Sequence, residues 1–330
     1  MSFRWIITVT LTLALGWSAY WWVGAGATRA GVEGWLSARA AEGWVANYDD
    51  LTVAGYPNRF DTTLTALDLA DPAEGWAWSA PAFQILSLSY DPGQVILAFP
   101  GVHTVATPRA AIAIEGQTLR ASARITLAQE VESLILEADA LALTGAEGGA
   151  VAERLVLASE AQGNLREHRL GLDARTVSLT GAWRETLDPA GILPEIMQSA
   201  RLDALATYSD VPGLPALSDR APAFDALDIT DLQITWGELD LRAQGSLVAD
   251  AAGFAEGSVR IRARNWRQML DAAVAAGLVD AQIASTAEMA LGLIADLSGD
   301  PHTLNADLTF RGGIAALGPI PIGEAPRLRP

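Results

Sequence analysis

The sequence contains no cysteine and no lysine, and only three of its 330 residues are histidine. The absence of cysteine excludes disulfide bonds, thiolate metal ligands and cysteine nucleophiles. The absence of lysine excludes Schiff-base chemistry and the lysine of a P-loop. His103, His168 and His302 lie in no paired ligand motif, so we expect turn or surface histidines, no metal site and no cofactor.

Charge is scarce and mostly negative. Charged residues make up 18% of the chain, and 22 arginines against 39 acidic residues give a net charge of -17. Such a charge repels a phosphate backbone, so nucleic acid is excluded as an expected partner. Hydrophobic residues make up 50% of the chain, which is too many for a disordered protein.

Common catalytic signatures are also missing. The sequence has no G-x-S-x-G elbow, no Walker loop and no G-x-G-x-x-G turn after a strand. Asp225, Asp228 and Asp231 are three residues apart, so neighbours in this trio point to opposite faces of a strand. We therefore expect no catalytic residues and a protein that is not an enzyme.

One long apolar run stands at the N-terminus. Trp5 to Val23 carries no charge and is long enough, as a helix, to cross a hydrocarbon core of ~30 Å. Arg4 precedes it, which predicts a cytoplasmic N-terminus and a periplasmic bulk on a single-pass inner-membrane anchor. The residues expected at the membrane interface are Trp17, Tyr20, Trp21 and Trp22.

A cleaved signal peptide is the alternative for residues 1–27. Ala25-Gly26-Ala27 fits a small-x-small cleavage site, although the apolar run is longer than a usual signal and ends in tryptophans. Cleavage would release the protein into the periplasm, so both interpretations export the remaining chain. Residues 28–47 follow with apolar side chains at helical spacing, which predicts an amphipathic juxtamembrane helix.

The rest of the chain alternates apolar and polar residues, as half-buried strands do. Clear examples are 95–99, 119–127, 239–247 and 304–310, and turn signals such as Asp91-Pro92-Gly93 separate them closely. These patterns predict a mainly β (α+β) fold of curved antiparallel meander sheets. A Pro- and Gly-rich stretch near Pro212 predicts two β-rich halves, 48–211 and 212–330.

Helical spacing appears in two places within these halves. Apolar residues from Pro189 to about Tyr208 predict one helix. A helical hairpin is predicted over 265–295, with Asn265 as the N-cap of its first helix and Gly277 as the stop.

Arg260, Arg262 and Arg264 form the one basic stripe of this acidic chain. A period of two places all three on one face of a strand, with Val259 and Ile261 on the other face. The stripe is a candidate contact for an anion or a lipid headgroup. A solvated sheet face paired with neighbouring carboxylates is the alternative.

A family resemblance rests on short glycine-centred motifs. The stretch 55–61, GYPNRFD, follows the apolar helix and leads into a strand, and Trp236-Gly237 and Asn265 follow in the second half. This pattern resembles an uncharacterised alphaproteobacterial family, domain of unknown function 2125, which implies topology and no catalytic residues. The motif residues that carry the resemblance are Gly55, Tyr56, Pro57, Arg59 and Phe60.

More remotely, the chain is similar in style to AsmA-like envelope proteins, whose curved sheets enclose an apolar groove for lipid. This analogy, with the many apolar residues on strands, predicts a lipid-handling or envelope-assembly module. The alternative is a structural or protein-interaction scaffold without a ligand, whose acidic surface meets a basic envelope protein.

Overall fold

The computed structural model describes residues 3–189, 191–213, 223–275, 281–297, 299–318 and 320–329. The chain forms two compact units, Met1–Arg124 and Ile125–Pro330. The boundary predicted near Pro212 differs from this division and lies inside the second unit. There the strands on either side of it pair with each other, because residues 199–208 run antiparallel to residues 224–235.

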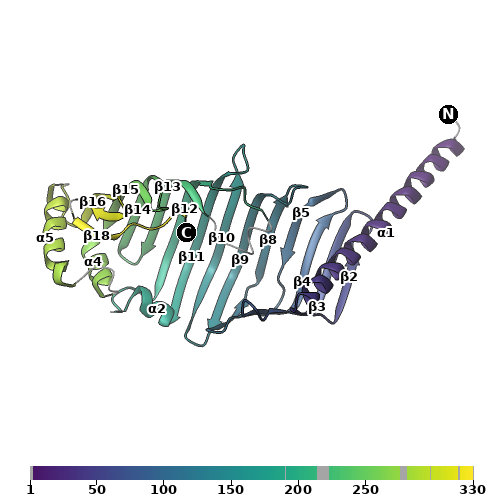
Figure 1. The fold of residues 1–330 in the computed structure, drawn as a ribbon, viewed down its shortest axis with the longest axis horizontal. Helices are drawn as coiled ribbons and strands as arrows, with labels where there is room; N and C mark the ends of the chain where they lie inside the picture. Colours follow the sequence, from purple (N-terminus) through teal and green to yellow (C-terminus); the bar gives the residue numbers. More distant parts are fainter. Residues whose placement is uncertain are drawn as a thin grey trace. The chain divides into compact units, whose positions relative to one another are not determined.

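The first unit consists of one long helix and short to medium strands (Figure 1). Its elements are α1 (Phe3–Ala41), β1 (Val45–Asn47), β2 (Asp50–Ala54), β3 (Arg59–Asp71), β4 (Trp76–Leu88), β5 (Asp91–Ala98), β6 (His103–Ala106), β7 (Ala111–Glu115) and β8 (Thr118–Ile125).

The helix α1 is continuous through both of the segments predicted as an anchor and a juxtamembrane helix. No proline interrupts this stretch, and burial of Ala25 and Leu36 against the strands stabilises the helix across glycines whose intrinsic propensity is low. The helix ends at Ala41, and Gly43 follows with a φ of 96° that only glycine adopts readily. The predicted helix 28–47 therefore ends early, and β1 occupies its last residues.

In the first unit β3 is the central strand. It pairs with β1, β2 and β4, and β4 continues the sheet to β5 and β6 with antiparallel pairing throughout. Leu51, Leu64 and Leu67 are buried against Leu36 of α1, so the helix covers this part of the sheet. Burial of side chains of this size stabilises a fold by about 1.5–3 kcal/mol each.

The second unit is a meander in which each strand pairs with the next along the chain. Its elements are β9 (Val131–Gly145), β10 (Gly148–Ala161), β11 (Glu167–Gly181), α2 (Ala182–Leu187), β12 (Ile196–Tyr208), β13 (Phe224–Trp236), β14 (Leu239–Ala249), β15 (Ala255–Arg264), α4 (Trp266–Ala275), α5 (Ala281–Leu297), β16 (Thr303–Arg311), β17 (Ile314–Leu317) and β18 (Ile320–Glu324).

The buried core of the second unit lies over its C-terminal strands. One cluster gathers Val259 and Phe310 with Ala325 and Leu328 of the C-terminal segment. A second cluster joins Trp266 of α4 and Leu291 of α5 to the first residues of β16. The C-terminal segment and the two helices therefore cover β14–β16 on one face.

The predicted helical hairpin over 265–295 corresponds to α4 and α5, whereas Gly277 lies outside the described residues. The helix predicted from Pro189 to Tyr208 is wrong, because Ile196–Tyr208 forms β12 between β11 and β13. Ladder hydrogen bonds on both sides outweigh a local apolar spacing that suits helix and strand alike. The coarse fold is confirmed as mainly β, with a long antiparallel meander, one long apolar helix and a few short helices.

Candidate functional site

The aromatic end of the apolar run is packed onto the turn between β2 and β3. Trp21 is buried, and its Nε1–H donates a hydrogen bond of 2.8 Å to the carbonyl oxygen of Arg59. Trp17 donates from Nε1 to the carbonyl oxygen of Pro57 at 2.9 Å. Two indole donors of the helix are thus satisfied by backbone acceptors of the same turn.

Hydroxyl groups add further contacts between α1 and the strands. The Ser18 and Tyr56 hydroxyls are 2.8 Å apart, and the Tyr56 ring meets Trp21 edge to face at 5.5 Å. Two residues after Ser18, the Tyr20 hydroxyl donates to the carbonyl oxygen of Ser89, which lies between β4 and β5. The helix is therefore fixed at two adjacent turns of the first unit.

Two glycines permit this close packing. A Cβ on Gly24 would lie 2.4 Å from Cζ of Phe60, whose ring is buried with Trp21 and Ala25. Gly55 has a φ of 99°, and a Cβ there would lie 2.8 Å from the Cβ of Arg59. Gly55 and Phe60, from the motif that carries the family resemblance, therefore shape the turn that receives α1.

The four predicted interface aromatics do not point the same way. Trp17, Tyr20 and Trp22 are exposed, whereas Trp21 faces the strands. Sequence reasoning treated the aromatic cluster and the Gly55–Phe60 motif separately, since about 40 residues lie between them. The shared glycine and aromatic content was the only local signal that could have linked them.

The helix α1 is long and apolar enough to cross a membrane by length and composition. From Phe3 to Leu15 its large apolar side chains are exposed, and this part extends beyond the strands of the first unit (Figure 1). A single helix of this kind near the N-terminus fits a signal anchor or a signal sequence equally.

An apolar face of the second unit is the other unusual surface. Along β9–β12, drawn as long neighbouring strands in Figure 1, leucines line one face without entering any buried cluster of the described residues. Within the described part of the chain, α2 is the one helix with more than isolated contacts to these strands, at the ends of β10 and β11. The leucines of this face, hereafter the leucine face, are Leu134, Leu136, Leu141, Leu155, Leu157, Leu170, Leu172 and Leu202.

Two residues with positive φ keep the apolar side chains of β9 and β11 on the leucine face. Ala140 on β9 has a φ of 49°, and the buried side chains Ala138 and Leu141 flank it only three residues apart. Thr176 on β11 has a φ of 51° in the corresponding position between Ala174 and Val177. Each left-handed residue shifts the alternation by one, so apolar side chains continue along the same face.

Polar residues occupy the opposite face of the same strands in paired rows. Arg169 and Asp203 form two hydrogen bonds of 2.8 and 2.6 Å, and Arg154 contacts Asp139 at 2.9 Å. Side-chain hydrogen bonding to Arg169 lowers the pKa of Asp203 below its ordinary value. The two faces thus differ sharply in polarity.

The predicted arginine stripe lies on this polar face at β15. Arg260, Arg262 and Arg264 are all exposed, whereas Val259 and Ala263 are buried on the other face. Arg260 is 3.5 Å from Asp307, and both side chains are more than half exposed, so the pair contributes little stability.

Arg262 has the least compensated charge of the stripe. Its cross-strand neighbours are Arg242 on β14 and Asn305 on β16, and no carboxylate pairs with it among the described residues. Two hollows of about 660 and 600 Å³ lie on this surface, beside Arg264 and Arg260 respectively. Carboxylates also line these hollows, Asp240 and Asp300 in the first and Asp307 in the second, so the stripe lies among mixed charges.

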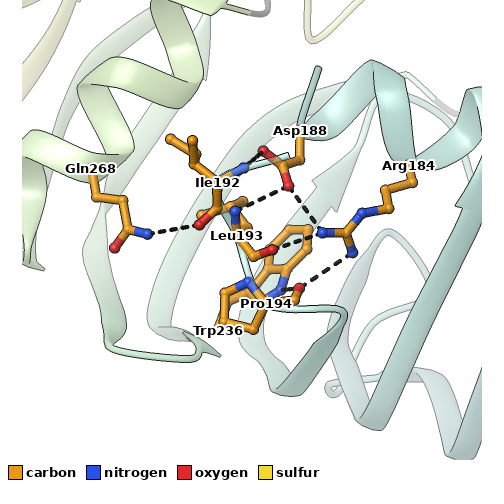
Figure 2. A network of polar contacts seen from close by, with 7 residues as sticks. All are labelled: Arg184, Asp188, Ile192, Leu193, Pro194, Trp236 and Gln268. Carbon is orange, nitrogen blue, oxygen red and sulfur yellow. Dashed lines mark hydrogen bonds and ion pairs between the residues drawn. The ribbon is translucent and has the colours of Figure 1, made fainter. Parts of the chain in front are cut away.

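Figure 2 shows a polar network in the loop between α2 and β12. The Asp188 carboxylate is fully buried, accepts backbone N–H bonds from Ile192 and Leu193 at 2.9 and 3.0 Å, and pairs with Arg184 at 3.1 Å. Arg184 in turn donates to the carbonyl oxygen of Leu193 at 2.7 Å. Every polar atom of the carboxylate is used in holding this loop.

The same loop receives the Trp236-Gly237 motif. Trp236 donates from Nε1 to the carbonyl oxygen of Pro194 at 2.7 Å, and Gln268 of α4 donates to that of Ile192 at 3.0 Å (Figure 2). A Cβ on Gly237 would lie 2.4 Å from Cγ of Pro194. This second family-like motif is therefore explained by packing, as the first is.

Two histidines predicted at the surface are instead buried. His168 is packed against the ring of Tyr208 and shares a hydrogen bond of 3.0 Å with the Ser159 hydroxyl. His103 accepts from Trp78 Nε1 at 3.2 Å. Burial lowers the pKa of both imidazoles, so they are packed in neutral form. His302 is exposed in a turn, as predicted.

No group of three or more potential metal-binding side chains occurs in the described ranges. A family model described as "Uncharacterized protein conserved in bacteria (DUF2125)" matches residues 21–326. The match includes the helix end, both glycine-centred turns and the arginine stripe. Comparisons with curated proteins and with solved structures found no match.

Proposed function

This chain belongs to the DUF2125 family of bacterial proteins, and we propose that it is a membrane-anchored, non-enzymatic module that handles lipid on the leucine face. The N-terminus is cytoplasmic in this proposal, α1 crosses the inner membrane once, and both units lie in the periplasm. Arg4 before the apolar run supports this orientation, because positive charge is retained on the cytoplasmic side.

Contacts of α1 support a retained anchor over a cleaved signal. Cleavage after Ala27 would remove Trp21 and Ala25, which are buried against Phe60, and would leave the turn carbonyls without their indole donors. The family match also begins at residue 21, upstream of the cleavage motif. A signal peptide destined for removal has no reason to form part of the buried core.

The leucine face is the observation that carries the lipid proposal. Soluble antiparallel sheets usually bury their apolar face under a second layer and expose only the polar one. Here most leucines of the leucine face are half-buried, Leu141 is buried, and Leu157 is 39% exposed. A continuous apolar surface of this kind in a membrane-anchored protein suits acyl chains.

Neighbouring residues on β10 provide a matched test. Leu155 lies on the leucine face across from Ala138 and Ala174, whereas Val156 lies on the polar face across from Glu137 and Asp173. We expect Leu155→Gln combined with Leu172→Gln to lower the phospholipid retained by the detergent-purified protein several-fold, as counted by native mass spectrometry. Val156→Gln should retain the wild-type amount, and equal retention by both variants would remove the lipid proposal.

A scaffold without ligand is the second candidate. The paired Arg and Asp rows of the polar face and the net charge of -17 favour a basic protein partner. Crosslinking in intact cells tests it, because a scaffold gives one stoichiometric protein adduct and a purified protein free of lipid.

A further inference from the structure

We infer that the first unit is inserted into the headgroup region of the bilayer through its own turns, so that α1 does not act as a flexible stalk. The inserted surface is an aromatic collar made of exposed rings from α1 and from the two turns that hold it. This inference rests on the proposed membrane anchor. The collar residues are Trp17, Tyr20, Trp22, Tyr56 and Tyr90.

The length of free helix sets the depth of insertion. The part of α1 before the packed region, Phe3 to Gly16, is about 14 residues and extends only ~21 Å. A hydrocarbon core of ~30 Å requires about 20 residues, so the span must continue to about Val23. Trp17 to Trp22 then form the last turns of the span, where the hydrocarbon core meets the headgroups, and the turns hydrogen-bonded to them lie at the same depth.

Most polar side chains of the packed helix turns at this depth have partners within the protein. The indole donors of Trp17 and Trp21 and the Tyr20 hydroxyl all have backbone acceptors, and Ser18 pairs with Tyr56. An unsatisfied polar group costs several kcal/mol in lipid but almost nothing in water. These internal pairs lower the cost of bringing the packed turns to the edge of the hydrocarbon core, while the exposed Trp22 indole and Tyr90 hydroxyl are left to meet headgroups.

The exposed side chains of the two turns match the chemistry of the interface. Tyr56 is 56% exposed and Tyr90 is 65% exposed, and the turns that carry them are joined by the Ser89 N–H to Asn58 carbonyl bond of 2.8 Å. Tyrosine and tryptophan concentrate where an apolar ring can meet acyl chains while its polar end meets water. The two turns thus add exposed tyrosines to the exposed aromatic residues of α1, and together these side chains form the aromatic collar.

Charged residues limit the insertion to the headgroup layer. Arg59 and Asp61 form an exposed ion pair of 3.0 Å at the start of β3, and Asp91 directly follows Tyr90. Ion pairs are tolerated among headgroups and strongly disfavoured in the hydrocarbon core. The unit therefore lies against the membrane surface with its collar at headgroup depth.

Single-cysteine spin labelling of the full chain in phospholipid bilayers tests this inference, because the natural chain has no cysteine. Labels replace Leu13 in the free helix, Tyr56 and Tyr90 in the collar, and Ala73 in the exposed turn at the far end of β3. We expect labels at Tyr56→Cys and Tyr90→Cys to show a several-fold higher ratio of oxygen to nickel-chelate accessibility than Ala73→Cys. The variant Tyr90→Cys removes no hydrogen bond or ring contact of the described residues. The accessibility measured there therefore reports membrane depth and not disruption of the turn.

The label at Leu13 distinguishes the membrane anchor from the inserted collar. If Leu13→Cys reports lipid while both collar labels match Ala73→Cys, the anchor holds and the inserted collar is wrong. If Leu13→Cys itself reports water, the anchor proposed above is wrong and the collar falls with it.

Discussion

At the scale of single residues, two glycines of α1 have very different surroundings. Gly24 faces Phe60 so closely that a side chain would overlap the ring, whereas a Cβ on Gly26 would meet nothing within 4 Å. Helix propensity alone would favour replacing either glycine, by about 1 kcal/mol. Packing therefore decides which replacement is harmful.

We predict that Gly24→Leu lowers the free energy of unfolding by about 1–2 kcal/mol, because overpacking exceeds the gain in propensity. Denaturant unfolding in detergent micelles, followed by tryptophan fluorescence, measures the change. Gly26→Leu is the control and should leave stability unchanged or raise it. Equal effects of both variants would show that α1 is not packed on Phe60.

Buried histidines make stability depend on pH. Because burial lowers the folded-state pKa of His103 and His168 below the ordinary 6.5, the unfolded chain binds protons first on acidification. Their contribution is fully present above pH ~6.5 and is lost as pH falls through the folded-state pKa. Stability should therefore fall on acidification through this window.

The variant His168→Gln tests this pH dependence. Free energies of unfolding measured between neutral and mildly acidic pH should decline less steeply than those of the wild type, at a lower starting stability. His302→Gln, at the exposed turn, should keep the wild-type slope. A wild-type slope in His168→Gln would contradict the assignment of a neutral buried imidazole.

At the scale of elements, the loop after α2 depends on one buried carboxylate. Asp188 neutralises Arg184 and accepts two backbone N–H groups, so Asp188→Ala would leave a partly buried cation and two donors unpaired. We predict a loss of about 3 kcal/mol or more. Hydrogen exchange at the amides of Ile192 and Leu193 should also accelerate, whereas the exposed Glu185→Gln on α2 should change neither quantity.

The arginine stripe is also a property of one element, because the alternation of side chains along β15 places its three arginines on one face. Replacing Arg260, Arg262 and Arg264 together by Gln should abolish the flotation of nanodisc-embedded protein with added anionic vesicles. The control on the same face replaces Arg154, Arg169 and Arg175, each of which lies within 2.9 Å of a carboxylate. Unchanged flotation of the stripe variant would leave Arg260–Arg264 as a solvated sheet face.

Local pattern predicted most elements and missed those that depend on distant partners. The alternation of β14, β15 and β16 and the helical hairpin follow from short-range spacing that survives in the structure. Residues 196–208 carry apolar side chains that fit either period, and only pairing with β11 and β13 selects the strand. The site at α1 was equally hidden, because Trp21 and Arg59 are brought together by folding alone.

At the scale of the whole molecule, each unit has strands that a helix or the C-terminal segment covers, and an apolar surface that no described element covers. In the first unit α1 covers β1–β3, and its N-terminal part exposes large apolar side chains. In the second unit the C-terminal segment and α4–α5 cover β14–β16, and the leucine face of β9–β12 remains open among the described elements. Both uncovered surfaces are apolar, which is why lipid is proposed as the common ligand.

Acyl-chain photocrosslinking tests whether the leucine face binds lipid. The full-length protein is reconstituted with a phospholipid that carries a diazirine on its acyl chain, irradiated, and mapped by peptide mass spectrometry. We predict adducts on the leucine face, at residues such as Leu155, Leu172 and Leu202, in addition to adducts on α1. Adducts on α1 alone, with the leucine face unlabelled, would contradict it.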